Sequence, residues 1–173
     1  MLRIPEFEVI PALSEESPPK GAGPGETVEA LSRAKAEEVY SKVSPDSIVI
    51  AADTIVYFSG EILGKPVDTE DAARMLRALS GNTHEVYTGV TIIKDGNILT
   101  DHEISAVTFR DLTEEEIAAY IKTGEPADKA GAYGAQGIAS LFVRKIDGDF
   151  YNVMGLPVCL MGEMLKKQGV NLL

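Results

Sequence analysis

The chain has 173 residues, of which 45% are hydrophobic, and its formal net charge at pH 7 is −11. This apolar content is enough to bury a core, as one domain or as two closely packed lobes. The excess of acidic residues argues against a nucleic acid polymer as the main partner, because binding to phosphate backbones requires clusters of lysine and arginine. We expect no membrane partner, because no apolar run approaches the roughly 18 residues of a membrane-spanning helix.

The cysteine content favours a reducing compartment. Cys159 is the single cysteine, so an internal disulfide is excluded and a cytoplasmic location is expected. The apolar neighbours of Cys159 in PVCLMGEML indicate a small core residue rather than a reactive thiol.

The first part of the chain combines a loop, a helix and an apolar strand. Residues 14–27 are rich in Pro, Gly and Ser and predict a loop that ends where Glu26 or Thr27 begins a helix. Residues 47–58, SIVIAADTIVYF, are a β-branched apolar run interrupted by one acid. This pattern favours a buried strand of a parallel sheet.

The remaining elements follow from apolar periodicity bounded by turn and capping residues. A helix cap is expected at Asp68 or Thr69, and Thr113 and Glu116 form a capping box. In chain order we expect a turn over 60–66, a helix over 67–81, a hairpin over 84–100 that turns at Asp95 and Gly96, a strand over 102–109, a helix over 112–124, two strands over 140–153 and a helix over 155–167. Together these elements predict a mixed α/β domain.

Asp53 is the first residue that we expect to carry chemistry. A carboxylate in an apolar strand is costly to bury unless it is paired or coordinates a metal, and ligands of α/β sheets bind at the carboxyl ends of strands. The alternative for Asp53 is a hydrogen bond to a neighbouring loop. Phosphatases that use a strand-end aspartate as nucleophile carry a second aspartate two residues on, where this chain has Ile55.

Charged residues near the turns are further candidates. Lys65 precedes a proline in LGKP, so it can face a phosphate as a point charge or simply be solvated. Glu15 and Glu16 precede the Pro- and Gly-rich stretch, where their oxygens bind a metal or remain hydrated.

Residues 124–137, GEPADKAGAYGAQG, are the most distinctive segment, and we call them the glycine-rich segment. Gly131, Gly134 and Gly137 let the backbone come close to a ligand. Gln136 can offer its amide to the edge of a base. The alternative is a tightly packed crossover in which Gln136 bonds to the backbone.

Four other polar residues have simpler interpretations. Asp128 and Lys129 predict an ion pair at the entry of the glycine-rich segment. His84 and His102 have no matching partners in the sequence, so we expect structural histidines rather than bases or ligands.

Five motifs, in order along the chain, resemble those of the Maf family of nucleotide pyrophosphatases. They are AADT (51–54), LGKP (63–66), MLRALSGNTHEVYTGV (75–90), EPADKAGAYGAQG (125–137) and KIDGDFYNVMGLP (145–157). The resemblance covers nearly the whole chain. It implies an elongated α/β fold in which a mixed sheet with flanking helices forms two lobes around a nucleotide cleft, and it implies a homodimer.

The resemblance also implies an activity. Maf proteins hydrolyse nucleoside triphosphates to the monophosphate and pyrophosphate with a divalent cation, Mg²⁺ or Mn²⁺. The DKAGAYGxQG form of the loop is similar to the branch that acts on dTTP, UTP and related or modified pyrimidine nucleotides. By this resemblance Asp53 is the proton acceptor, Thr54 and Gln136 shape substrate choice, Lys65 faces the phosphates, and Glu16 lies near the metal. The residues themselves leave open whether Asp53 is a base or a metal ligand.

The start of the chain departs from the family pattern. Family members begin with a strand and an S-x-R-R segment that opens a helix, whereas this chain begins MLRIPEFEVIP. We therefore expect a single Maf-like domain over residues 1–173 that is truncated at its N-terminus relative to the family. Either the true start lies upstream, or the chain is a truncated form that lacks part of the phosphate-binding side.

Two functions from different classes follow. The first is a metal-dependent nucleoside triphosphate pyrophosphatase with pyrimidine preference, favoured by Asp53, Lys65 and Gln136. The second is a catalytically weak nucleotide-binding or regulatory protein linked to septum formation and cell division, favoured by the missing arginine segment. A purely structural domain leaves the glycine-rich segment unexplained.

Overall fold

The computed structural model describes residues 7–13 and 18–172, and the chain divides into two compact units. The first unit comprises Met1–Asp53, Thr88–Glu103 and Leu156–Leu173, and the second unit comprises Thr54–Tyr87 and Ile104–Gly155. The helices are α1 (Pro24–Tyr40), α2 (Thr69–Leu79), α3 (Glu114–Ile121), α4 (Phe150–Val153) and α5 (Val158–Lys167), with short 3₁₀ turns η1 (Glu125–Asp128), η2 (Ala130–Ala132) and η3 (Ile138–Leu141). No helix of the described residues has the length and apolar character to cross a membrane.

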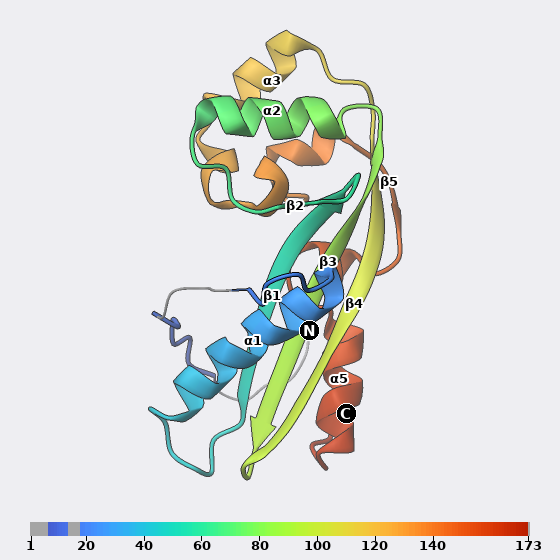
Figure 1. Ribbon diagram of the computed structural model, residues 1–173. Helices are drawn as coiled ribbons and strands as arrows, with labels where there is room; N and C mark the ends of the chain where they lie inside the picture. The colour runs from blue at the N-terminus through green and yellow to red at the C-terminus, as the bar shows by residue number, and fades with distance from the viewer. Residues whose placement is uncertain (1–6, 14–17, 173) are drawn as a thin grey trace. The chain divides into compact units, whose positions relative to one another are not determined.

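Five strands of the described chain form one antiparallel sheet (Figure 1). The strands are β1 (Val49–Phe58), β2 (Glu61–Leu63), β3 (Thr83–Lys94), β4 (Asn97–Phe109) and β5 (Val143–Asp147), hydrogen-bonded in the order β2-β1-β3-β4-β5. The turn predicted between β3 and β4 is confirmed, because Asp95 and Gly96 both have positive φ, 51° and 76°. Such angles at both central residues are typical of a tight hairpin. The predicted mixed α/β fold with flanking helices is therefore confirmed.

The expectation of a parallel strand over residues 47–58 is wrong. β1 pairs antiparallel with β2, with Val56 opposite Leu63, and the arrows of β1 and β3 point in opposite directions in Figure 1. Ser59 and Gly60 join β1 to β2 with positive φ at both residues, which is hairpin geometry and not the crossover of a parallel pair. An apolar run indicates that a strand is buried, but it does not indicate whether the neighbouring strands are parallel or antiparallel to it.

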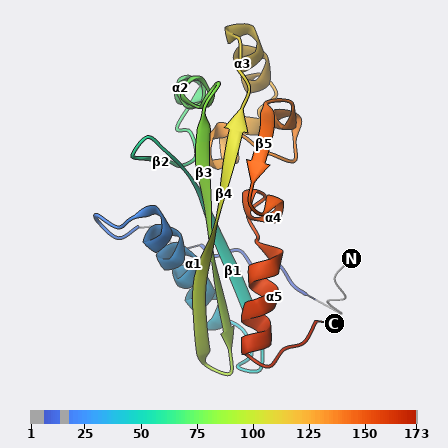
Figure 2. The ribbon, with the colours of Figure 1, turned by 90° about the vertical axis from the view of Figure 1, so that its right-hand side faces the viewer.

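In the first unit, helices cover both faces of the sheet. Figure 2 shows α1 and α5 on opposite sides of the strands. Successive side chains of β3 point alternately toward these two faces of the sheet. Val90 and Ile92 pack with methionines of α5, whereas Thr91 bonds the hydroxyl of Ser32 on α1 at 2.9 Å. Cys159 lies on the exposed face of α5, so the expectation of a core cysteine is wrong.

The helix starts show local capping. α1 begins at Pro24, two residues before the first predicted start, because proline is well suited to the first helical turn. Asp68 caps α2 by accepting a hydrogen bond from the backbone N–H of Asp71. The capping box of Thr113 and Glu116 is present at α3, as predicted.

The second unit has its own core beneath α2 and α3. That core includes Leu76, Leu79, Val107, Phe109, Ile117, Tyr120, Tyr133 and Phe142. Only β5 of the two strands predicted over residues 140–153 forms. Asp149 accepts a hydrogen bond from the N–H of Tyr151 at 2.7 Å and starts the single-turn helix α4. The capping carboxylate therefore outweighs the strand preference of the aromatic residues that follow.

Candidate active site

Asp53 lies in β1 within the first unit and is 8% exposed. Its Oδ1 accepts a hydrogen bond from Nζ of Lys35 on α1, at 2.5 Å. The predicted need for a partner is thus met by a cation, which offsets the cost of burying the carboxylate. Burial, charge and an adjacent ammonium group make Asp53 suitable for accepting a proton or binding a cation.

Lys35 was not predicted from the sequence as a partner of Asp53. Its position follows Val28 and Leu31, which are both buried, at the three- and four-residue spacing of one helix face. A lysine that continues the apolar stripe of a helix signals a partner inside the protein. This pattern of a lysine on an apolar helix face is present in residues 28–35.

The oxygens of Asp53 fit a hard divalent cation in their chemistry. Mg²⁺ is bound by one or two carboxylates together with water and substrate phosphates, rather than by a cage made only of protein atoms. One buried carboxylate is consistent with that mode, although Lys35 competes for Oδ1. Glu16, the other predicted metal residue, lies outside the described residues.

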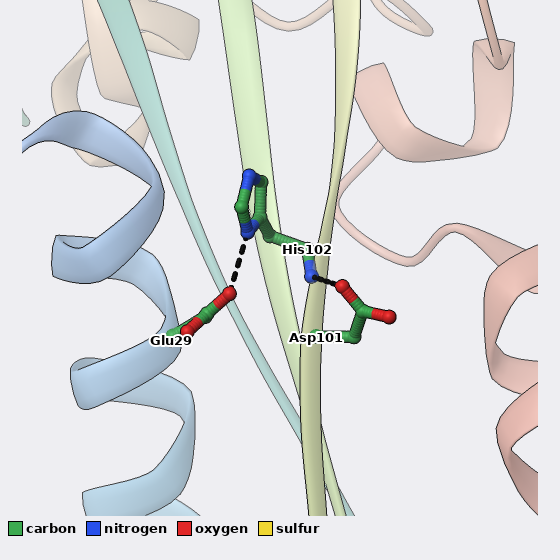
Figure 3. Close-up of side chains that lie close together, drawn as sticks. All are labelled: Glu29, Asp101 and His102. Carbon is green, nitrogen blue, oxygen red and sulfur yellow. Dashed lines mark hydrogen bonds and ion pairs between the residues drawn. The ribbon is translucent and has the colours of Figure 1, made fainter.

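One acidic and histidine group stands out among the described residues. Ligand atoms of Glu29, Asp101 and His102 lie within 4.8 Å of one another. Figure 3 shows Glu29 and the imidazole on one side of β4 and the carboxylate of Asp101 on the other. Nδ1 of His102 is 2.6 Å from Glu29, and Asp101 accepts from the backbone N–H of His102 at 2.9 Å.

Thr54, a predicted substrate residue, lies in the second unit and is partly buried. Its Oγ1 would be 3.3 Å from a Cβ placed on Gly155, whose φ is +100°. The fold therefore brings the AADT motif against the end of the NVMG sequence. A side chain at position 155 would face both backbone strain and the hydroxyl of Thr54.

Lys65 is exposed in the turn after β2. The carbonyl of Gly64 accepts a hydrogen bond from the N–H of Gly131 at 3.0 Å, so this turn is attached to the glycine-rich segment. The pKa of Asp128 is lowered, mainly by its hydrogen bond and charge interaction with Lys129 and to a smaller degree by Lys65. Lys65 therefore lies close to the segment that carries Gln136. The predicted Asp128–Lys129 ion pair is confirmed, with 2.6 Å between Oδ1 and Nζ.

Protein neighbours explain two of the glycines in the glycine-rich segment. Gly131 has a φ of +66°, and a Cβ there would lie 2.8 Å from Cγ2 of Val56. A Cβ on Gly137 would overlap the carboxylate of Glu125. The packed-crossover interpretation therefore holds for these two positions, while Gln136 is exposed on the same segment.

Both histidines have hydrogen-bonding partners, which agrees with the expectation of structural histidines. Buried His84 places Nε2 at 2.8 Å from the hydroxyl of Tyr133, in the glycine-rich segment. Burial lowers the pKa of His84 to about 4, so this imidazole is neutral at pH 7. His102 pairs with Glu29 as described above.

A groove of about 870 Å³ lies between α2 and α3 in the second unit. Its lining contains none of the four described site candidates, Asp53, Thr54, Lys65 and Gln136. Arginines of this groove are paired with local carboxylates, as in the bidentate contact of Arg77 with Glu114 at 2.7 Å. Such neutralised cations make a poor anion site, so the groove is not our candidate.

Known proteins match this chain along almost its full length. A family model described as Maf-like protein matches residues 1–168. A dTTP/UTP pyrophosphatase of Alkaliphilus metalliredigens is 47% identical over 171 residues, 97% of this chain and 88% of the relative. A dTTP/UTP pyrophosphatase of Clostridium tetani is 49% identical, and the match covers 98% of this chain and 90% of the relative. A third, of Dechloromonas aromatica, is 50% identical over 90% of this chain and 80% of its own length.

Proposed function

The chain belongs to the Maf family, and we propose that it hydrolyses dTTP, UTP and related pyrimidine nucleoside triphosphates to the monophosphate and pyrophosphate. The relatives described above carry the name dTTP/UTP pyrophosphatase. The observation that carries the proposal is the buried Asp53 carboxylate of the AADT motif with the Lys35 ammonium at 2.5 Å. A buried carboxylate held in place by a cation can act as a general base in the hydrolysis of a phosphoanhydride.

In the proposed reaction Asp53 takes a proton from the attacking water. The water oxygen forms a bond to the α-phosphorus, the bond from that phosphorus to the bridging oxygen breaks, and pyrophosphate leaves with the electron pair. Lys35 holds the carboxylate in place through its hydrogen bond to Oδ1. Asp53, together with the predicted Glu16, would hold a divalent cation, Mg²⁺ or Mn²⁺, which would neutralise charge on the leaving group.

Substrate recognition is assigned to residues of the second unit. We assign Lys65 to the phosphates as an exposed point charge and Gln136 to the base, whose polar edge the amide can pair. Thr54 shapes substrate choice from β1. A pocket that pairs its polar groups with one base disfavours a base that leaves them unpaired.

The test is pyrophosphate release from dTTP, UTP, CTP and GTP with Mg²⁺ or Mn²⁺. We expect turnover of dTTP and UTP above that of GTP, and loss of turnover when the metal is removed with a chelator. Nucleotide binding without any pyrophosphate release would instead support the binding or regulatory alternative. No turnover and no binding would remove the proposal altogether.

We further propose a cytoplasmic homodimer. The single cysteine suits a reducing compartment, and the resemblance to the Maf family supports the dimer. Light scattering after size exclusion should give twice the chain mass of 18.5 kDa. The mass of one chain would contradict the dimer without affecting the proposed reaction.

A further inference from the structure

The glycine-rich segment presents Gln136 on a tight turn that is held at both ends. The N–H of Gly137 donates to the carbonyl of Gly134 at 2.9 Å, which closes a turn with Ala135 and Gln136 at its centre. Gln136 is exposed at this turn, whereas Gly134 and Ala135 are buried. The direction of the Gln136 side chain is therefore set by whatever fixes the two ends.

Glu125 fixes the end that follows Gln136. Its Oε2 accepts a hydrogen bond from the N–H of Ile138 at 3.0 Å, and its Oε1 accepts a longer one from Ala139 at 3.5 Å. Gly137 has no side chain to keep this carboxylate away, and a Cβ there would lie 2.7 Å from Oε2. A residue other than glycine would separate the turn from its anchor.

The same carboxylate reaches the other end through Tyr120. The hydroxyl of Tyr120 donates to Oε1 of Glu125 at 2.9 Å and accepts from the N–H of Gly134 at 3.3 Å. Burial by itself would raise the pKa of Glu125, but the bonds from Ile138, Tyr120 and Ala139 outweigh burial and lower it. The carboxylate is therefore ionised at neutral pH and accepts from both sides of the turn.

We propose that Glu125, acting with Tyr120, is a positioning residue for nucleotide selectivity, because it clamps the turn that presents Gln136. This inference rests on the proposed function, in which Gln136 reads the base. A recognition group discriminates only when its supporting contacts hold it within a fraction of an ångström. Glu125 touches no nucleotide in this scheme and acts through Gln136 alone.

The experiment compares Glu125→Gln and Tyr120→Phe with Glu115→Gln, a matched exposed glutamate on the neighbouring helix α3. In Glu125→Gln we expect KM for UTP to rise about tenfold with kcat nearly unchanged, because a hydrogen bond to a charged acceptor is lost. The selectivity of Glu125→Gln for UTP over CTP should also fall, whereas Glu115→Gln should match the wild type. In Glu125→Gln/Gln136→Ala, the change at 125 should add no further loss of selectivity.

A second measurement is independent of turnover. Amide hydrogen exchange of Gly134, Ile138 and Ala139 should accelerate about tenfold or more in Glu125→Gln, because the anchoring bonds are weakened. Unchanged exchange, or unchanged selectivity despite faster exchange, overturns the inference. Equal loss of kcat for every nucleotide also overturns it, since that result indicates general structural damage. A wild-type protein that releases no pyrophosphate refutes the proposed function itself, which is a different outcome.

Discussion

The polar contacts of α1 differ in kind from those beneath the glycine-rich segment. At α1, side chains pair with side chains: Lys35 with Asp53, and Glu29 with His102, the latter two being 37% and 28% exposed. In the glycine-rich segment, the carboxylate of Glu125 binds backbone N–H groups instead. Charge pairs between side chains can exchange partners when an ionic ligand arrives, whereas backbone anchors fix the chain. In the proposed function, the chemistry therefore depends on side-chain pairs and the selectivity on backbone anchors.

The strongest test of the α1 region is Asp53→Asn. We expect pyrophosphate release to fall by about 10² to 10⁴, because an amide neither accepts the proton nor carries the negative charge. Asp46→Asn, an exposed aspartate of the first unit, is the control and should keep wild-type activity. If Asp53→Asn is as active as the wild type, the assignment of this carboxylate is wrong.

The strongest test of the region beneath the glycine-rich segment uses pH. Burial lowers the pKa of His84 to about 4, whereas the unfolded chain titrates near 6.5, so the unfolded state binds more protons between these values. Stability is therefore complete above about 6.5 and decreases as the pH falls toward 4, by about 3 kcal/mol for this group.

Urea unfolding at several pH values checks this prediction against His84→Gln, which lacks the titrating group. The wild type should lose more stability than the variant between pH 6.5 and 4, whatever the variant's stability at pH 7. Parallel pH profiles would show that His84 does not titrate as its burial indicates.

A smaller effect separates the glycines of the segment. Gly131→Ala should cost about 1 to 3 kcal/mol of unfolding free energy, because φ is +66° and the new Cβ would press on Val56. Gly134→Ala is the matched control, since its Cβ would make ordinary contacts at 3.5 Å and its φ is not positive. Denaturant unfolding measures both, and equal losses would mean that the two positions are not distinguished by packing.

The smallest effect belongs to the Glu29–His102 pair. Glu29→Gln should change the unfolding free energy by less than about 1 kcal/mol, because both side chains are partly exposed. The difference from the wild type should shrink at high salt, where screening weakens the pair. A large loss of unfolding free energy that does not depend on salt would mean that this pair stabilises the fold as strongly as the backbone anchors do.

Local sequence signals predicted much of the fold. The cap at Asp68, the capping box of Thr113 and Glu116, and the turn at Asp95 and Gly96 depend on neighbouring residues, and each is present. Strand direction was not predictable in the same way. β1 pairs antiparallel with β2 because a two-residue turn joins them, whereas the sequence predicted only a turn over residues 60–66 there.

Some residues of the candidate site were predicted from the sequence and others were not. Asp53 was identified because one acid in an apolar strand requires a partner, and it is buried beside a cation. Lys35 and Glu125 were missed, because each acts on residues distant in sequence or across a loop. The assignments of Thr54, Lys65 and Gln136 remain predictions that the nucleotide assays test.

The sequence by itself determined most of the element types, the helix caps and the motifs of the Maf family, because these depend on residues within a few positions of one another. Only the tertiary structure decided that Lys35 pairs with Asp53 and that Glu125 closes the turn of Gln136. Those contacts join residues 18 and 13 positions apart, respectively. Such pairings depend on how whole elements pack. A buried charged group requires a partner, but burial does not specify which residue that partner is.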